Sequence, residues 1–357
     1  YRVFVDDVGA ICPTARSINS QLNVDPATVA GTLSSSAVVC SGSSGTLSLS
    51  GKTGSVVQWE SSINNGGSWN AIANTGTSQN YTNITQSTLY RVLVQSGVCL
   101  SVYSNVDTIT VNPIPDAIAS ITNQTICSGN AITAISFSGS VPGTVFNWTR
   151  NQTANVTGIA SSGTGNISGS LTNTTNTQKT VTFTITPTYT FGGTTCTGTA
   201  ITADVVVSPT PSITATNTNQ SICTYFGTSG TTGENQRITA MSSITISDAN
   251  NVSGVTYTWT RTNTTNITGA PASGSGSSIP SYNLVNKTTS IQTTVFTITA
   301  TSPGGCTSTT TATVQVNPNI ENNNIYLVSE CFVPADSAQI VIAQQGAPVT
   351  GGDGNYV

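Results

Sequence analysis

Eight cysteines are the residues of this chain whose type and spacing could do chemistry, since it contains no histidine. They keep a regular distance from four Val-x-Pro tripeptides, called markers below, at Val24-Asp25-Pro26, Val111-Asn112-Pro113, Val207-Ser208-Pro209 and Val316-Asn317-Pro318. Early cysteines follow a marker proline by 14 residues (as in 40 minus 26) or by 13, and they are Cys40, Cys127, Cys223 and Cys331. Late cysteines precede a marker proline by 12 to 14 residues (as in 113 minus 99), and they are Cys12, Cys99, Cys196 and Cys306. The pattern indicates structural disulfides, because zinc sites need cysteines about two to four residues apart and no two cysteines are that close.

Each complete repeat between two markers holds one early and one late cysteine, and we expect these two to pair within the repeat. Eight cysteines can pair in roughly a hundred ways. The recurrence of one spacing in three repeats favours this pairing: Cys40 with Cys99, Cys127 with Cys196, and Cys223 with Cys306. Cys12 and Cys331 are then unbridged within the chain, with partners expected before residue 1 and beyond residue 357. The alternative is that the cysteines are free buried thiols of a cytosolic protein.

Short β-strands must position these cysteines, because the chain is rich in β-branched residues and has 33 Gly and 14 Pro for turns. Proline has no N–H to donate to a neighbouring strand, so each marker is expected to end a strand and begin a short linker. Successive marker prolines are 87, 96 and 109 residues apart (113 minus 26, 209 minus 113, 318 minus 209), close to the roughly 100 residues of a β-sandwich. The predicted fold class is all-β, with tandem β-sandwiches.

The repeats are of two kinds. Residues 27–113 are a repeat of the first kind. The next two repeats share a different sequence pattern, for example F-N-W-T-R at 146–150 and Y-T-W-T-R at 257–261. The predicted domains are the end of a preceding sandwich at 1–26, sandwiches at 27–113, 114–209 and 210–318, and the start of a further β domain at 319–357. The sandwich at 210–318 carries an insertion between its early cysteine and its tryptophan.

Tryptophan positions predict parts of the core and one candidate contact site. Alternation of apolar residues places one tryptophan of each complete repeat on an inward face, and we expect Trp59, Trp148 and Trp259 to pack in the core. The later Ser/Thr/Gly tracts read as loops, and they contain Gly163, Gly165, Gly274 and Gly276. Trp69 follows the turn sequence N-N-G-G-S at 64–68, where an exposed indole could stack on a sugar ring. Packing of Trp69 beneath its own turn is the alternative.

Charge and composition exclude several classes of function. The chain has 9 Lys+Arg and 13 Asp+Glu, and its 6% of charged residues compares with about 25% in ordinary soluble domains. With a net charge of -4, it offers no basic surface for nucleic acid. Without histidine, we expect no enzyme activity, no cofactor and no metal centre. The segment Asp248-Ala249-Asn250-Asn251 is interpreted as a plain turn, with calcium binding as the alternative. No apolar run is long enough for a transmembrane helix.

Several short motifs resemble a known group of surface proteins. They are C-S-G at 40–42 and 127–129, V-Q-W-E-S-S at 57–62, Y-R-V at 90–92 and the closing Val-x-Pro markers. These motifs resemble the Ig-like and PKD-like repeats of giant secreted proteins of the Bacteroidetes, and above all gliding-motility adhesins exported by the type IX secretion system.

This resemblance implies an extended rod of tandem β-sandwiches. The sandwich at 27–113 and the domain that ends at 1–26 are then Ig-like, and those at 114–209 and 210–318 are PKD-like. It implies a structural stalk segment of a secreted cell-surface adhesin or filament, associated with the outer membrane. The implied partners are anchoring or secretion proteins at the cell surface, together with glycans or the substratum. Thr108 and Ser337 lie in Asp-Ser/Thr-aliphatic triplets like those O-glycosylated in exported Bacteroidetes proteins. The alternatives are glycan-binding accessory repeats of a secreted polysaccharide-degrading enzyme, and a filament subunit joined to its neighbours by strand exchange.

Overall fold

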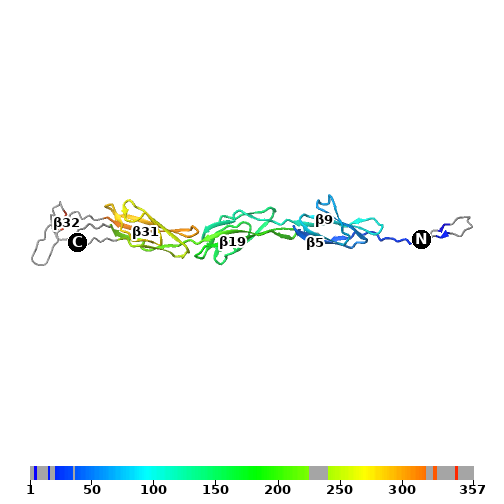
Figure 1. The fold of residues 1–357 in the computed structure, drawn as a ribbon, viewed down its shortest axis with the longest axis horizontal. Coiled ribbons are helices and arrows are strands. Elements are labelled where there is room, and N and C mark those ends of the chain that lie inside the picture. The colour runs from blue at the N-terminus through cyan, green and yellow to red at the C-terminus, as the bar shows by residue number, and fades with distance from the viewer. Residues whose placement is uncertain are drawn as a thin grey trace. The chain divides into compact units, whose positions relative to one another are not determined.

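The computed structural model describes residues 4–5, 15–16, 21–34, 37–224, 240–318, 325–327 and 342–344. Every regular element in this part of the chain is a β-strand (Figure 1), so the prediction of an all-β fold of tandem sandwiches is confirmed. Contacts divide the chain into unit 1, residues 1–172 and 179–207, and unit 2, residues 173–178 and 208–357. Cys12, Cys331, Ser337 and most of the predicted insertion after Cys223 lie outside the described residues.

The first sandwich belongs to unit 1 and consists of two antiparallel-rich sheets. Its smaller sheet has the order β3 (Thr32–Ser34), β5 (Ser43–Ser50), β8 (Ser78–Ile84). Its larger sheet has the order β4 (Ala37–Cys40), β11 (Asp107–Asn112), β9 (Thr88–Gln95), β6 (Ser55–Ser62), β7 (Asn70–Ile72), and β10 (Val102–Tyr103) also pairs with β9. Burial alternates along β9, so every second side chain enters the core between the sheets.

The second sandwich also lies mainly in unit 1. Its large sheet has the order β13 (Asn123–Cys127), β21 (Ile201–Ser208), β19 (Lys179–Phe191), β15 (Val145–Arg150), β17 (Ser162–Thr164), and β20 (Thr194–Thr197) extends β19 as a hairpin. Two small sheets complete it: β12 (Ile118–Ala119) with β14 (Phe137–Ser138), and β16 (Val156–Gly158) with β18 (Leu171–Asn173). Trp148, Phe183 and Ile185 lie in its core.

The third sandwich lies in unit 2 and repeats this plan. Its large sheet has the order β23 (Asn219–Cys223), β31 (Thr307–Asn317), β30 (Gln292–Thr301), β25 (Thr256–Arg261), β27 (Ser273–Ser275). The remaining strands form β22 (Ile213–Ala215) with β24 (Ile244–Asp248) and β28 (Ser278–Ile279), and β26 (Ile267–Thr268) with β29 (Val285–Asn286). Two short strand pairs lie outside the sandwiches: β1 (Phe4–Val5) with β2 (Ala15–Arg16), and β32 (Ile325–Leu327) with β33 (Ile342–Gln344).

Glycine packs directly against tryptophan in the second and third sandwiches, which corrects the interpretation of two glycine tracts as loops. Gly163 lies in β17 opposite Trp148, and Gly274 lies in β27 opposite Trp259. A Cβ atom at either glycine would overlap the facing indole. Each indole also meets a phenylalanine edge-on, with ring centroids 5.8 Å apart in the second sandwich and 5.6 Å apart in the third. The glycines are therefore strand positions that leave room for an aromatic ring.

Candidate functional site: a disulfide-bonded junction between sandwiches

A disulfide joins the first sandwich to the second within unit 1. It links Cys40, the last residue of β4, to Cys196 in β20, with the two Cα atoms 5.6 Å apart and a sequence separation of 156. Cys127 and Cys306 are disulfide-bonded as well. The expected pairings of Cys40 with Cys99 and of Cys127 with Cys196 are therefore wrong. In this structure Cys99 is a free thiol.

Strand length explains why Cys40 cannot reach Cys99. Cys40 lies opposite Asn112 at the end of β11, which is the edge where β9 begins. Cys99 follows the other end of β9, a strand of 8 residues. At about 3.3 Å per residue this strand separates the two cysteines by about 25 Å, whereas a disulfide requires Cα atoms within about 7 Å.

The same geometry corrects the third expected pairing. Cys223 lies opposite Asn317 at the end of β31, and Cys306 immediately precedes the start of that strand. The 11 residues of β31 hold the two cysteines at opposite ends of the third sandwich. Cys223 is an exposed thiol at the end of β23, so the expected bond between Cys223 and Cys306 is wrong.

Asn112, the middle residue of the second marker, connects the two sandwiches beside the disulfide. Strand β4 runs parallel to β11 in a register that sets Cys40 beside Asn112. The buried Asn112 amide donates to the carbonyl oxygens of Phe191 (3.0 Å) and Thr194 (3.1 Å) in the β19–β20 hairpin. The Thr194 hydroxyl in turn donates to the Val38 carbonyl at 2.9 Å. One hairpin of the second sandwich is therefore held by three hydrogen bonds and a covalent bond at the strand ends of the first.

The middle residues of two other markers also contact a turn that carries a late cysteine. In unit 1, the Asp25 carboxylate accepts a hydrogen bond from the Val98 N–H at 3.0 Å, and the Cys99 sulfur lies 3.9 Å from the Asp25 carbonyl oxygen. In unit 2, the Cys306 sulfur lies 3.8 Å from the Ser208 carbonyl oxygen. Sequence reasoning missed these residues, although the polar residue between valine and proline in every marker was a visible signal.

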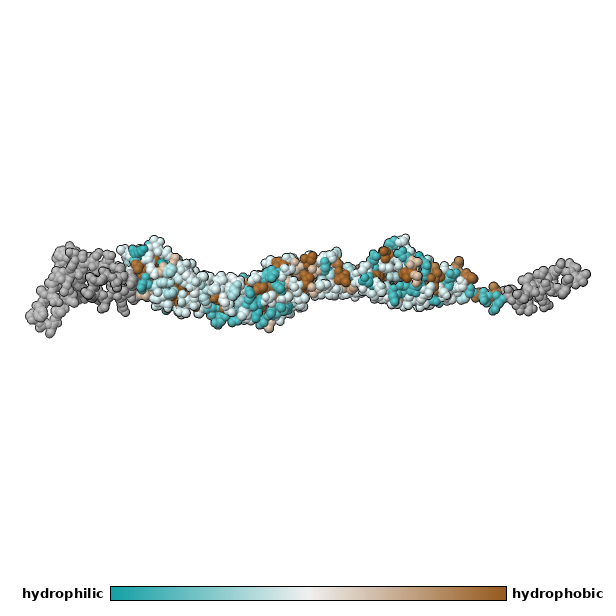
Figure 2. Space-filling model, in the orientation of Figure 1, coloured by the Kyte–Doolittle hydropathy of each residue, from teal (hydrophilic) through white to brown (hydrophobic). Residues whose placement is uncertain are grey.

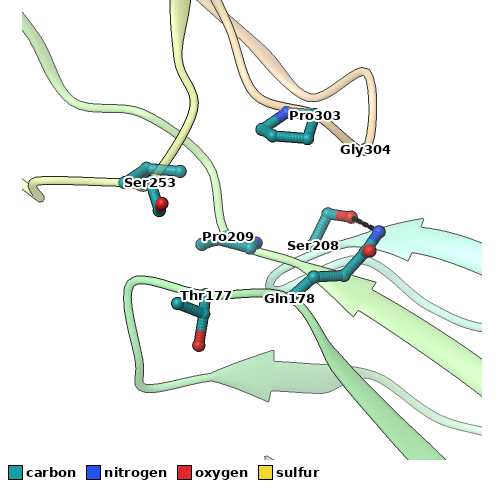
Figure 3. Close-up of a pocket in the computed structure, with 8 residues that line it drawn as sticks. Thr177, Gln178, Ser208, Pro209, Ser253, Pro303 and Gly304 are labelled. Atoms are coloured by element: carbon teal, nitrogen blue, oxygen red, sulfur yellow. Dashed lines mark hydrogen bonds between the residues drawn. The ribbon is translucent and has the colours of Figure 1, made fainter.

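A cavity of about 300 Å³ adjoins Ser208 in unit 2. Figure 3 shows the side chain of Gln178 directed at Ser208, to whose hydroxyl its amide donates at 2.8 Å, with Pro209 and Pro303 nearby. All eight lining residues are Thr, Gln, Ser, Pro, Val or Gly, and none of these side chains titrates. The cavity therefore offers packing and amide contacts rather than acid–base chemistry.

Trp69 belongs to an ion-pair cluster on the first sandwich. The Arg91 guanidinium lies between two rings, 4.0 Å from the centroid of Trp69 and 3.9 Å from that of Tyr103. It also pairs with the Glu60 carboxylate at 2.7 Å, which accepts a further hydrogen bond from Tyr103. Burial raises the pKa of Glu60, but the hydrogen bonds and the arginine charge outweigh it and hold this pKa below its usual value. One face of the Trp69 ring is thus covered by arginine, and sugar stacking on its other face stays a prediction.

The other predicted positions have clear locations. Trp59, Trp148 and Trp259 are buried in the cores of the three sandwiches. Thr108 is half-buried in β11, which has neighbouring strands on both sides, and its glycosylation stays a prediction. The Asp248 carboxylate accepts hydrogen bonds from backbone N–H groups of Ser212, Asn250 and Val252. Asp248 therefore organises a turn.

In the described ranges, no group of three or more His, Cys, Asp or Glu side chains could hold a metal ion. Among the same residues there is also no helix with the length and apolar character to cross a membrane.

Comparison with known proteins places similar domains along the chain. Two solved structures that resemble it are protocadherin gamma B2 cadherin domains 1–5 (11% identity, TM-score 0.35, 84% of this chain and 60% of that one) and mouse cadherin-23 EC22–24 (11%, 0.33, 81% and 100%). Likenesses this weak carry no argument about function. No curated protein sequence matches the chain.

Family models match three segments. Residues 29–113 match a domain family of unknown function (DUF8696), and residues 124–211 and 236–320 match the PKD-like domain. The second and third sandwiches are therefore similar to PKD-like domains, as the resemblance of the sequence motifs implies.

Proposed function

We propose that the chain is a stalk segment of a large secreted cell-surface adhesin, in which bonded sandwiches carry tension between an anchor and a distant contact. The observation that supports this proposal most directly is the disulfide between Cys40 and Cys196, which joins two sandwiches instead of closing one. A bond that only stabilised a fold would need to link parts of the same sandwich. A bond across a junction opposes the separation of neighbours.

Tension would follow a short covalent path through unit 1. A force that enters before β4 reaches Cys40, crosses the sulfur–sulfur bond to Cys196 and leaves through β21. The residues between these cysteines lie in a closed loop that the force cannot extend. In the chain-entropy model, closing a loop of this length stabilises the folded state by about 5 kcal/mol. The bridge therefore protects most of two sandwiches at once.

Strand direction adds a second source of resistance. The third sandwich lies outside this closed loop, and its entry strand β23 pairs in parallel with its exit strand β31. Opposite forces on the start of one strand and the end of the other act along the strands, so they load the hydrogen bonds between them together. Separation of these strands requires several bonds to break in one step.

The surface chemistry fits a place outside the cell. The visible surface of the described sandwiches is mostly neutral to hydrophilic (Figure 2), although only 6% of the residues are charged. Hydration by Thr, Ser and Asn depends little on ionic strength. Disulfides persist in oxidising compartments and are rare in the cytosol. Export by a type IX system, a role in gliding and association with the outer membrane are the more specific form of this proposal and rest on the sequence resemblance.

Binding to glycans is the second candidate function, and the Trp69, Arg91 and Tyr103 cluster favours it. A glycan array probed with the oxidised chain separates the two functions, with Trp69→Ala as the matched variant. The stalk proposal expects no specific glycan and the same background for both proteins. Specific binding that Trp69→Ala abolishes would favour the accessory-repeat function instead. For the location, protease added to intact cells that make the protein should cleave it without lysis; a chain that resists until lysis contradicts a surface stalk.

A further inference from the structure

The turn between β9 and β10 places a free thiol beside two exposed apolar side chains. Cys99 is half-buried in this turn, while its neighbours Val98 and Leu100 are 93% and 88% exposed. Its thiol donates a weak hydrogen bond to the Pro26 carbonyl oxygen at 3.6 Å. A soluble sandwich gains nothing from two apolar side chains held in water at the tip of a turn, so these residues point to a surface that another molecule covers.

The equivalent turn of the second sandwich shows what such a surface can do. In the β19–β20 hairpin, Cys196 is bonded to Cys40 at the end of β4, and Asn112 of the adjoining marker binds the hairpin backbone. In the first sandwich, Asp25 of the preceding marker already binds the turn through the N–H of Val98. The contact between the marker residue and the turn is therefore already present around Cys99. Among the described residues, no cysteine lies where Cys40 lies relative to Cys196.

The extended segment that leads into Asp25 is an independent sign that another domain packs here. Leu22 and Val24 are 64% and 81% exposed, although the valines in the same place in the third and fourth markers, Val207 and Val316, are fully buried. Those two valines lie in β21 and β31 and belong to the hydrophobic cores of the second and third sandwiches. Brown side chains mark this end of the first sandwich in Figure 2. Leu22 and Val24 alternate with polar residues, as in a strand that packs on a core, but both side chains are exposed.

We propose that the Val98–Leu100 turn docks on a further β-sandwich of the same build, the one that ends at the Val24-Asp25-Pro26 marker, and that Cys99 is disulfide-bonded to the early cysteine of that sandwich. The position of that cysteine follows from the register of the described sandwiches. Cys40 lies opposite Asn112 and Cys223 opposite Asn317, so the early cysteine lies beside the middle residue of its own marker. A cysteine opposite Asp25 would therefore meet the Cys99 sulfur.

Cys12 does not fit this role. Early cysteines precede the marker proline that ends their own sandwich by 73 to 95 residues (113 minus 40, 318 minus 223). Cys12 precedes Pro26 by 14 residues, which is the spacing of a late cysteine. The partner is therefore the early cysteine of the sandwich that ends at the Val24-Asp25-Pro26 marker, and not Cys12.

Bond formation requires an oxidant. The two thiols lose two protons and two electrons as the sulfur–sulfur bond forms, and a disulfide, either of a protein oxidant or of oxidised glutathione, accepts them and is reduced to two thiols. The hydrogen-bonded turn holds Cys99 in place before this exchange, so the bond would form after docking.

Peptide mapping under non-reducing conditions tests the proposal. The protein is isolated from the cells that make it, with alkylation at lysis, and the peptide that contains Cys99 is identified by mass spectrometry. We expect it cross-linked to a peptide in which a cysteine follows a β-branched run, in a segment that ends about 70 to 100 residues later in Val-x-Pro. In a Cys99→Ser strain that partner cysteine should become fully alkylated, while the matched Cys40→Ser strain should keep the Cys99 cross-link and release Cys196 for alkylation.

Three results would overturn the proposal. They are recovery of Cys99 as an alkylated thiol, a bond from Cys99 to Cys12, and a bond between Cys99 residues of two copies of the chain. Each would leave the stalk proposal standing, because that proposal rests on the bond between Cys40 and Cys196.

Discussion

Removal of the disulfide between the sandwiches should lengthen the pulled chain by a predictable amount. Handles attached at Leu22 and Thr210, through chemistry that uses no cysteine, place the bond between Cys40 and Cys196 on the pulled path. With the bond intact, full unfolding can extend only the residues outside the loop, 18 on one side (40 minus 22) and 14 on the other (210 minus 196). The double variant Cys40→Ser/Cys196→Ser should release the segment between the cysteines as well, a sequence separation of 156.

The released length follows from backbone dimensions. A fully extended chain spans about 3.3 to 3.6 Å per residue, so 156 residues give about 510 to 560 Å of additional contour length. Optical tweezers resolve such a length, and the contour length at complete unfolding is the quantity to compare. The matched control is Cys99→Ser, which removes a thiol of the first sandwich and should leave the contour length unchanged. Equal contour lengths for the oxidised chain and the double variant would refute the force path derived above.

Three further predictions concern single side chains. Gly163→Ala places a methyl group against a buried indole and should destabilise the second sandwich by about 1 to 3 kcal/mol, measured by urea unfolding, whereas the exposed neighbour Thr164→Ala should change it little. The pKa of Glu60 is lowered in the folded state, so the ionised Glu60 stabilises the first sandwich fully above the unfolded pKa of about 4.3, and this stabilisation is lost as the pH falls further. The thermal unfolding temperature of Glu60→Gln should therefore depend less on pH below that value than that of the unmodified protein. Identical pH profiles would contradict the ion-pair cluster. Asn112→Ala removes two hydrogen bonds to the hairpin of the next sandwich and should cost about 1 to 3 kcal/mol and speed up proteolysis at residues 191–194, an effect that Asn317→Ala in the third sandwich should not have.

The sequence predicts the fold well because its signals are local. Alternation of apolar residues identifies strands, and the marker prolines identify strand ends, so the all-β fold and the buried tryptophans could be expected. The strand positions of Gly163 and Gly274 could not be predicted, because their sequence neighbours are Ser, Thr and Gly and the indoles that they face lie in another strand. Cross-strand packing of this kind leaves no signal in the local sequence.

The disulfide pairing could not be predicted because the sequence spacing of the cysteines does not show which sandwich each of them faces. The recurrence of early and late cysteines is equally compatible with pairing inside a repeat and with pairing between one repeat and the next. Strand length decides between them, since β9 holds Cys99 about 25 Å from Cys40. That distance follows only when β4, β11 and β9 are known to be neighbours in one sheet.

The length of β9 also sets the order of events when the protein is made. As the chain emerges, Cys99 appears 59 residues after Cys40 (99 minus 40), long before Cys196, and the two are free to cross-link while the segment is still unfolded. Such a premature bond would prevent β9 from forming and would have to be reshuffled by thiol exchange. Once the first sandwich folds, β9 keeps Cys40 and Cys99 apart until the second sandwich is synthesised and folds. We therefore expect correct pairing to be fastest when the first sandwich folds before its cysteines are oxidised, and a strong oxidant that acts during synthesis should trap the chain with mispaired thiols.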